Sequence, residues 1–483
     1  MSSDADGSIE PADLAACLRV LARLDELPVE HPDAVAVRRA TATVFKTVKE
    51  RRRAERRAAI LANDEAVTAA TATGAPGRID DETRGLPLVS VAGGAHAGEL
   101  LRARGCYVCK TRYTRVDAFY HQLCPECAAR NRARREARTD LTGRRALLTG
   151  GRAKIGMYIA LRLLRDGAET TITTRFPRDA ARRFMAMEDS DEWLHRLRVV
   201  GVDLRDPAQV ITLADSVIAE GPLDILINNA AQTVQRSAAS YALLAEAEAA
   251  LLDAGPGPEL VTIGTAGPAG AIAASNDSGH PAPHWAPTPQ ILTELSLAAR
   301  SASPARVAAG SAIDAGGLIP DSDPVNSWTQ HVEEVNAIEL LEVQLCNVTA
   351  PFILISRLRG ALAASPARRT YIVNVSAMEG QFSRGYKGPG HPHTNMAKAA
   401  LNMLTRTSAR ELRTDGILMT SVDTGWITDE RPHPMRMRLA EDGFHAPLDL
   451  VDGAARVYDP IVRGESGEDI HGCFLKDYEP SPW

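Results

Sequence analysis

The stretch Arg145-Ala-Leu-Leu-Thr-Gly-Gly-Arg-Ala-Lys-Ile-Gly156 decides how this chain is expected to fold. The apolar run 146–148 predicts a short buried strand, and the threonine and two glycines after it predict a tight turn. Apolar residues then recur at helical spacing from Ile155 to Arg165. A strand, a glycine turn and a helix form the opening unit of a dinucleotide-binding sheet, where turn amides and the helix N-terminus receive a pyrophosphate. The pattern is weak alone, so its weight depends on later landmarks.

Further strand patterns follow in the order that such a sheet requires. They lie at 170–174, 198–202, 223–227, 371–375 and 418–422, with helical patterns between them. Strands separated by helices form a parallel sheet that is covered on both faces, and its ligand binds beyond the carboxyl ends of the strands. The expected fold class is therefore α/β, a doubly wound parallel sheet of the Rossmann type.

Length and composition limit the alternatives. At 483 residues the chain exceeds the usual size of one domain, and its apolar content of 45% suffices for a large core. The formal net charge of −6 argues against a nucleic-acid-binding protein as a whole. Residues 1–10 are polar and acidic, and we see no run of about 18 apolar residues. We therefore expect no secretory signal, no membrane span and a cytoplasmic location.

Two Cys-x-x-Cys pairs, separated by residues 110–123, predict one metal site. The ligands are Cys106, Cys109, Cys124 and Cys127. Thiolates suit Zn²⁺, and four protein ligands leave no open position, so the expected site is structural rather than catalytic. The alternative is a pair of reduced turns without metal. His121 is a substitute ligand if one cysteine fails geometrically.

The chain before the cysteines predicts a helical extension. Apolar residues recur at helical spacing from Leu14 to Leu21, and a second helix is expected over 33–66. That helix carries Lys46, Lys49, Arg51, Arg52, Arg53, Arg56 and Arg57. A solvated helix face is the ordinary interpretation, and contact with RNA or another polyanion is the alternative. A linker is expected at 68–88.

Three parts follow from these patterns: a helical extension and linker at 1–95, a zinc module at 96–138, and a dinucleotide-binding domain at 139–483 with an insertion at 232–330. The insertion is expected to be mobile over 254–288 and helical around 288–300. It follows the fourth strand, so it is either a lid over the ligand or a surface and oligomer-contact loop. Gln232 and Arg236 would be the lid residues nearest the ligand.

Residues 141–483 resemble the short-chain dehydrogenase/reductase family. The resemblance rests on residues 149–156, Asp203, Leu204, 228–231, Asn347, Ser376 and Lys398. It implies transfer of hydride between a nicotinamide cofactor and a small carbonyl, alcohol or imine substrate, and it implies a homodimer or homotetramer. Neither a membrane nor a nucleic acid is expected as a partner.

The expected site follows from that resemblance. The cofactor-binding residues would be Thr149, Gly150, Arg152, Lys154, Ile155, Gly156, Arg175, Asp203, Leu204, Asn229, Ala230, Lys398 and the backbone of Ile427. Ser376 would donate a hydrogen bond to the substrate carbonyl, and Asn347 would position a water molecule. Lys398 would bind the ribose and lower the pKa of a nearby acid. Asp203 would accept a hydrogen bond from the adenine.

The second strand indicates which nicotinamide cofactor binds. An acid at its carboxyl end would bind a ribose 2′-hydroxyl, but Glu169 lies at the opposite end. Arg175 stands at the carboxyl end and suits a 2′-phosphate. Arg152 and Lys154 add cations at the glycine turn. NADP(H) is therefore the predicted cofactor.

Two positions depart from the family pattern. Lys154 replaces the middle glycine of the turn, and Thr394 replaces the catalytic tyrosine four residues before Lys398. A threonine hydroxyl is a far poorer acid than a phenol, whose pKa is about 10. The candidates for a replacement are Tyr386, then the histidines His391 and His393, then water oriented by Thr394. An NADP(H)-dependent carbonyl reductase or alcohol dehydrogenase is the predicted function, and a nucleotide-binding scaffold or sensor without redox activity is the alternative.

Overall fold

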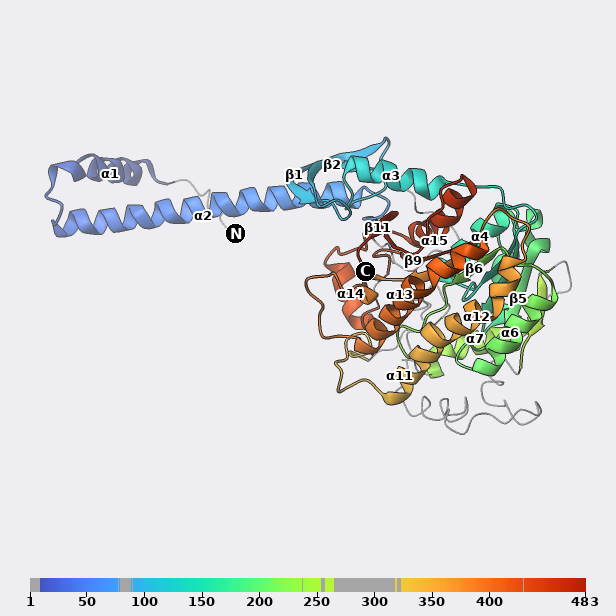
Figure 1. Cartoon of the computed structure of the whole chain (residues 1–483). Coiled ribbons are helices and arrows are strands. Elements are labelled where there is room, and N and C mark those ends of the chain that lie inside the picture. The colour runs from blue at the N-terminus through green and yellow to red at the C-terminus, as the bar shows by residue number, and fades with distance from the viewer. Residues whose placement is uncertain are drawn as a thin grey trace. The chain divides into compact units, whose positions relative to one another are not determined.

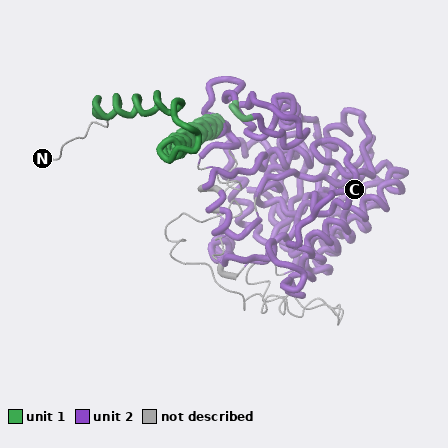
Figure 2. Tube along the Cα trace, turned by 90° about the vertical axis from the view of Figure 1, so that its left-hand side faces the viewer, with its two compact units in different colours: residues 1–67, 100–102 green, residues 68–99, 103–483 purple. Residues whose placement is uncertain are grey.

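The computed structural model describes residues 9–76, 78, 88, 90–236, 238–252, 257–264, 318, 323–428 and 430–483. The chain forms two compact units (Figure 2). Unit 1 comprises Met1–Val67 and Leu100–Arg102, and unit 2 comprises Thr68–Glu99 and Ala103–Trp483. The two units meet near residue 67, and the cysteine segment lies in the same unit as the sheet.

Unit 1 consists mainly of two helices, α1 (Pro11–Ala22) and α2 (Pro32–Ala69). Both begin at a proline, which suits the first helical turn because its missing amide has no partner there. None of the residues of α1 is buried, and Ala34 is the buried residue among those of α2. The basic run of α2 is exposed, which agrees with the ordinary interpretation of a solvated face.

In the described part of unit 2, nine strands form one sheet in the order β11-β10-β9-β8-β6-β3-β4-β5-β7. Strands β5, β6, β9 and β11 of this sheet are labelled in Figure 1. The strands are β3 (Arg145–Leu148), β4 (Glu169–Thr174), β5 (Leu197–Gly201), β6 (Ile225–Asn228), β7 (Glu259–Thr262), β8 (Thr370–Ser376), β9 (Ile417–Asp423), β10 (Phe474–Lys476) and β11 (Glu479–Ser481). All pairs are parallel except β10 with β11. The predicted α/β doubly wound fold is confirmed.

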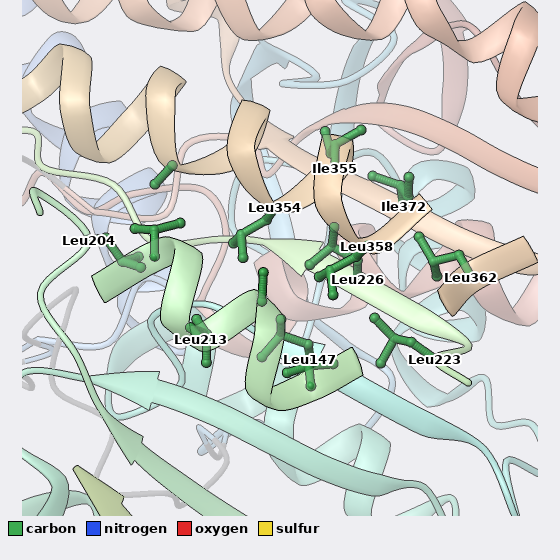
Figure 3. Packing of buried hydrophobic residues seen from close by; sticks show 14 of the residues in the cluster. Leu147, Leu204, Leu213, Leu223, Leu226, Leu354, Ile355, Leu358, Leu362 and Ile372 are labelled. Atoms are coloured by element: carbon green, nitrogen blue, oxygen red, sulfur yellow. The ribbon is translucent and has the colours of Figure 1, made fainter. Parts of the chain in front are cut away.

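The helices of the described part of this domain are α4 (Lys154–Arg165), α5 (Pro177–Met185), α6 (Pro207–Ala219), α7 (Ala242–Ala249), α11 (Ala337–Gln344), α12 (Ala350–Ala363), α13 (Pro392–Leu412), α14 (His433–Glu441) and α15 (Leu450–Glu465). Figure 3 shows Leu213 of α6 and Leu358 of α12 in one buried cluster with Leu147 and Leu226 of the sheet. Full burial of such a side chain stabilises the fold by about 1.5–3 kcal/mol. The cluster fixes the strands whose carboxyl ends carry the predicted site.

The helical run Ala337–Ala363 corrects one expectation. Its 27 residues have a hydropathy of 1.5 over the most apolar window, so by length and composition alone it could cross a membrane. No run of this kind was expected from the sequence. Leu354 and Leu358 of this run are fully buried in the cluster of Figure 3, as in the core helix of an α/β domain.

Two other expectations are corrected. β7 lies within the segment that was expected to be mobile, and its residues pair with β5 at the edge of the sheet. The remainder of that segment and the expected helix around 288–300 lie outside the described residues. Within the expected linker at 68–88, Thr71, Ala72 and Thr73 are buried, and Thr73 donates a hydrogen bond from Oγ1 to the carbonyl of Phe119 at 2.8 Å.

The cysteine module is a small β-hairpin followed by a helix. β1 (His96–Gly105) pairs antiparallel with β2 (Arg112–Asp117), and α3 (Pro125–Glu136) follows. Cys106 directly follows β1, and Cys124 is the N-cap of α3. The fold therefore brings the two cysteine pairs to one end of the module.

Candidate functional site

A cleft of about 400 Å³ lies at the carboxyl ends of the central strands. Of the predicted cofactor residues, Gly150, Arg152, Lys154, Ile155, Gly156, Arg175, Asp203, Leu204, Asn229 and Ala230 line it. Thr149, Ile427 and Lys398 are buried and are not among its lining residues. The parallel register explains the convergence, because β3, β4 and β6 are neighbours that end at the same edge.

The glycine turn has a shape that side chains would obstruct. Gly150 has a φ of +71°, and a Cβ atom there would lie 2.9 Å from the Cα of Ala230. A Cβ atom on Gly156 would lie 2.0 Å from the carbonyl oxygen of Gly150. The side-chain amide of Asn229 donates to the carbonyls of Thr149 and Gly150, both at 3.1 Å. This turn leaves its backbone bare toward the cleft and fits a coenzyme pyrophosphate.

Lys154, the first residue of α4, has a φ of +53°. A residue with a side chain costs about 1–2 kcal/mol in this left-handed conformation, which glycine adopts freely. The backbone therefore keeps the shape that the family glycine would allow, although a lysine occupies the position. Its side chain adds a cation to the lining of the cleft.

Arg175, at the end of β4, lies over two aromatic rings. Its guanidinium carbon is 5.7 Å from the ring centroid of Phe176 and 5.2 Å from that of Tyr241, and it donates to the Tyr241 hydroxyl at 3.2 Å. The electrostatic interaction with Tyr241 is the main reason why the pKa of Arg175 is raised. By contrast, Arg152 donates to Asp179 at 2.6 Å. Arg175 is thus held at the cleft without a carboxylate in direct contact among the described residues.

Asp203 has a different partner from the expected adenine. Its carboxylate accepts hydrogen bonds from Arg205 at 2.7, 3.0 and 3.1 Å, and Arg205 also donates to Glu342 at 2.5 Å. Burial raises the pKa of Asp203, but the adjacent Arg205 guanidinium outweighs it and holds the pKa at about 2. Asp203 is therefore an ionised, paired carboxylate, and an adenine amino group would have to share it with Arg205.

The predicted catalytic side chains around the end of β8 are buried. Ser376 is the last residue of β8 and pairs in register with Asp423 of β9. Thr394 and Lys398 lie one turn apart on α13. Among the described residues, Ser376 Oγ, Thr394 Oγ1 and both ring nitrogens of His393 have no hydrogen-bond partner, although each residue is 2% exposed. Buried polar groups without partners are rare in native proteins, and a bound ligand is one way in which their bonding is completed.

Lys398 and Asn347 are both engaged with backbone. Lys398 Nζ donates to the carbonyl of Val375 at 2.8 Å, and burial lowers the pKa of Lys398 to about 8. Asn347 lies in the π-helical turn Leu345–Thr349. It accepts a hydrogen bond from the amide of Gln232 at 2.7 Å and donates to the Gln232 carbonyl at 2.9 Å. Asn347 thus holds the start of the insertion.

The three candidates for the missing acid differ in position. Tyr386 is 76% exposed and does not line the cleft. His391 is stacked on Trp328 with ring centroids 3.9 Å apart, and its Nδ1 lies 2.8 Å from the Trp328 carbonyl oxygen. His393 is buried, with Nε2 at 3.7 Å from Oε1 of Glu339. The structure therefore brings His393 and Thr394 into the interior and leaves Tyr386 outside it.

Sequence reasoning missed two buried glutamates on α11. Glu342 accepts from the side chain of Gln232 at 2.7 Å, and Glu339 accepts from the amide of Gln235 at 3.0 Å. Glu342 is 1% exposed and Glu339 is 4% exposed. The sequence held one signal for these buried acids: they stand three residues apart on an otherwise apolar helix just before Asn347. The other predicted lid residue, Arg236, lies 3.9 Å from Glu430.

The four predicted metal ligands are close together. The sulfur atoms of Cys106, Cys109, Cys124 and Cys127 all lie within 4.8 Å of one another. Cys109 Sγ and Cys124 Sγ are 3.7 Å apart, which agrees with the edge of a tetrahedron with Zn–S bonds of about 2.3 Å. His121 is turned to Thr73, with Nδ1 at 2.8 Å from Oγ1. The geometry fits a metal with four thiolate ligands.

Comparison with known proteins agrees with this architecture. The family model for short chain dehydrogenase matches residues 144–249. The uncharacterized protein R665 of Acanthamoeba polyphaga mimivirus is 29% identical over 376 residues, which cover 74% of this chain and 71% of the relative. A probable oxidoreductase of Streptomyces lividans is 41% identical over 91 residues, 19% of this chain and 29% of the relative.

Solved structures are similar at lower identity. A Pseudomonas aeruginosa RhlG/NADP active-site complex is 19% identical with a TM-score of 0.42, and the match covers 70% of this chain and 95% of that one. An NADPH-bound carbonyl reductase from chicken fatty liver is 16% identical with a TM-score of 0.42 and coverage of 71% and 100%. The family match over residues 144–249, the glycine turn and the strand order lead to one assignment. Residues 144–249 are similar to the short chain dehydrogenase family, and the sheet that contains them has the matching strand order.

Proposed function

We propose that the protein is an NADP(H)-dependent oxidoreductase that interconverts a small carbonyl or imine compound and its reduced form. The observation that carries this proposal is Ser376, whose hydroxyl is buried at the end of β8 and has no partner among the described residues. A hydroxyl that only capped the strand would be bonded to it. An unbonded donor at this edge suits a ligand oxygen instead.

The choice of NADP(H) rests on Arg175. The guanidinium is fixed by Phe176 and Tyr241 at the end of β4, where the adenosine ribose of a coenzyme on the glycine turn would lie. A planar guanidinium binds a 2′-phosphate through two parallel hydrogen bonds. The bound coenzyme would supply or accept the hydride.

The buried side chains then have separate tasks. Ser376 donates to the substrate oxygen, on which negative charge develops as hydride arrives. Lys398, when protonated, adds a positive charge that lowers the pKa of a nearby acid. Asn347 keeps Gln232 in place at the wall of the cleft. These tasks require no residue from outside the described part of the chain.

For the proton donor we favour His393 over Tyr386. Both ring nitrogens of His393 are buried without a hydrogen-bond partner among the described residues, and Oε1 of Glu339 lies 3.7 Å from Nε2. Thr394, on the next position of α13, would orient the substrate. Tyr386 is exposed and would have to move to reach the substrate.

The proposal extends to the other expectations. A structural Zn²⁺ held by the four cysteines would stabilise the module, whose own apolar core is small. By resemblance to the family, the protein would form a homodimer or homotetramer, and we place it in the cytoplasm. The competing function is a nucleotide sensor without redox activity, and the replacement of the family tyrosine by Thr394 is the observation that favours it.

The test combines binding with turnover. NADPH and NADH are titrated against the wild type and Arg175→Ala, and a panel of carbonyl substrates is assayed with Ser376→Ala, His393→Ala and Tyr386→Phe. We expect NADPH to bind at least tenfold more tightly than NADH, and Arg175→Ala to remove that preference. Activity should fall in the Ser376 and His393 variants and persist in Tyr386→Phe. Binding of NADPH without turnover of any substrate would favour the sensor.

A further inference from the structure

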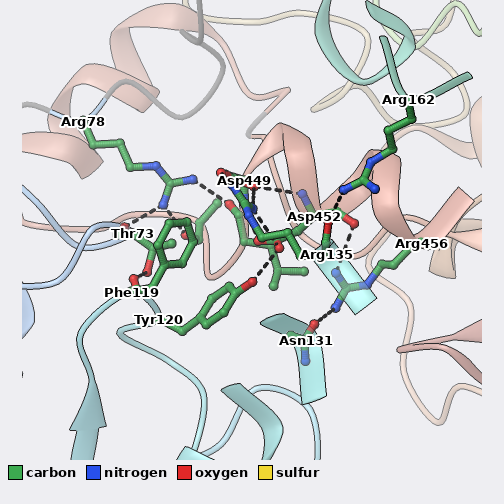
Figure 4. A network of polar contacts seen from close by, with 12 residues as sticks. Thr73, Arg78, Phe119, Tyr120, Asn131, Arg135, Arg162, Asp449, Asp452 and Arg456 are labelled. Carbon is green, nitrogen blue, oxygen red and sulfur yellow. Dashed lines mark hydrogen bonds and ion pairs between the residues drawn. The ribbon is translucent and has the colours of Figure 1, made fainter. Parts of the chain in front are cut away.

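The cysteine module is attached to the sheet domain through buried charges, shown in Figure 4. Arg135 of α3 donates to Asp449 at 2.6 and 2.9 Å and to Asp452 at 2.9 Å. The hydroxyl of Tyr120 donates to Asp452 at 2.6 Å. These contacts join a segment near residue 130 to one near residue 450.

The same two aspartates form the N-terminal cap of α15. Asp449 accepts from the amide of Asp452 at 2.8 Å, and Asp452 accepts from the amide of Asp449 at 3.1 Å. Arg78, which precedes the module, donates to the carbonyls of Ala446 and Leu448 at 2.8 and 2.6 Å. Leu450, the first residue of α15, lines the coenzyme cleft. The module thus fixes one wall of the cleft.

A second contact comes from inside the first cysteine pair. The hydroxyl of Tyr107 accepts a hydrogen bond from the amide of Trp426 at 2.9 Å. Trp426 belongs to the loop that follows β9, and this loop continues to Thr428, which lines the cleft. The preceding Gly425 has a φ of +81°, and Asp423 accepts from its amide at 2.9 Å. The loop is therefore held at one end by β9 and in its middle by Tyr107.

The loop has little room to move while the module is in place. A Cβ atom on Gly453 of α15 would lie 2.2 Å from Ile427 Cδ1 and 3.3 Å from Ile155 Cδ1. Ile155 belongs to α4, the helix that follows the glycine turn. Module, α15, loop and α4 form one closely packed series, so the position of residues 106–109 affects the loop at 424–428.

We propose that the cysteine module is a positioning element for the coenzyme site, and that Tyr107 is the positioning residue. Metal bound by the four cysteines fixes the turn 106–109, Tyr107 then holds the Trp426 amide, and the loop 424–428 keeps the shape that closes the cleft. The link to coenzyme rests on the function proposed above. Since coupling between two ligands is reciprocal, metal would strengthen coenzyme binding and coenzyme would strengthen metal binding by the same factor.

The deciding measurement is hydrogen exchange of the peptide that contains 424–428, in zinc-loaded protein without coenzyme. Tyr107→Phe keeps the ring and the cysteines but removes the acceptor. We expect its Trp426 amide to exchange about fivefold faster, the factor that one neutral hydrogen bond contributes. Tyr113→Phe is the matched control, because its hydroxyl donates to the His121 carbonyl inside the module at 2.9 Å. The control should leave the exchange of the loop unchanged.

Two further arms separate this inference from the proposed function. Removal of zinc with a chelator should speed exchange of the loop in the wild type and add little in Tyr107→Phe. The dissociation constant of NADPH should rise about fivefold in Tyr107→Phe, with the zinc content unchanged. Unaltered exchange in Tyr107→Phe and in the zinc-free protein would overturn the inference while leaving the function intact. A wild type that binds no NADPH would overturn the proposed function, and the exchange results would still decide the role of Tyr107.

Discussion

The surface between the module and α15 and the region around the carboxyl end of β8 are both buried and polar, but their side chains are bonded very differently. At the first, the single carboxylate of Asp452 accepts three hydrogen bonds, from Tyr120, from Arg135 and from the backbone amide of Asp449. At the second, Ser376 and Thr394 have no hydrogen-bond partner among the residues that the structure describes.

The difference shows what each region contributes. A buried polar group without a partner costs about 1–3 kcal/mol, whereas a bonded one contributes about 1 kcal/mol or more to stability. The module surface therefore stabilises the fold and fixes the relative position of its parts. The unbonded hydroxyls around the end of β8 destabilise the unliganded protein, and a bound substrate would recover that free energy.

The largest expected effect is at the module surface. Arg135→Gln leaves Asp449 and Asp452 buried, side by side and without their cation, and it should lower the free energy of unfolding by about 3–5 kcal/mol. Urea denaturation of the zinc-loaded protein measures this loss. Arg132→Gln is the control on the same helix, because Arg132 is 42% exposed in its pair with Asp117 and should cost under about 1 kcal/mol. Equal losses in the two variants would contradict the stabilising role of the network.

Ser376→Ala should give the opposite result. Removal of one preorganised donor to a developing oxyanion lowers kcat by about 10²–10³, which is about 3–4 kcal/mol of barrier. The free energy of unfolding should change by less than about 0.5 kcal/mol or rise, since no hydrogen bond is lost. Steady-state kinetics and urea denaturation on the same sample give both quantities. A loss of stability as large as that of Arg135→Gln would erase the contrast between the regions.

Lys398 gives a pH dependence of intermediate size. Burial lowers its pKa to about 8, and Glu379 and Cys346 are the neighbours that raise it. If the ammonium form assists proton transfer, kcat/KM should fall up to tenfold per unit of pH above about 8. The folded pKa lies below the ordinary value of about 10.4, so the burial penalty on the charged form weakens stability below pH 8. That penalty should disappear as the pH rises from 8 to about 10.4. A flat rate profile from pH 7 to 9.5 would exclude the ammonium from the rate-limiting step.

The smallest effect is expected at Lys154. Lys154→Gly relieves a left-handed φ of +53° that costs about 1–2 kcal/mol, but glycine loses about 0.5–1 kcal/mol more backbone entropy on folding. The net gain should be about 0.5–1 kcal/mol in urea denaturation. Lys154→Ala keeps the strain while removing the charge, and should show no such gain. If Lys154 contributes to phosphate binding, both variants should bind NADPH more weakly to the same extent.

The sequence predicted those parts of the fold that depend on local pattern. The strands ending at Leu148, Thr174 and Asn228 were found within one or two residues, because an apolar run bounded by turn residues identifies a buried strand directly. The clustering of the four cysteines of the module also followed from local spacing. β7 was missed because its four residues lie within a segment whose composition resembles a loop.

Contacts between distant residues could not be predicted in the same way. Arg135 and Asp449 are separated by 314 positions, and nothing in either neighbourhood indicates the other. The pairing of Asp203 with Arg205 is local, but an acid after a strand is equally compatible with a free carboxylate that awaits a ligand. The position of Tyr386 depends on the path of a glycine-rich turn, for which sequence pattern offers many solutions.

The shared cap of α15 has a consequence for protein engineering. Asp449 and Asp452 satisfy backbone amides of the helix and, with the same carboxylates, receive Arg135 and Tyr120. A chimera in which residues 96–138 were exchanged for another four-cysteine module would therefore inherit an acidic helix start with no cation opposite it. A graft across this boundary should succeed only when the cysteine module and the start of α15 are taken together from the same protein.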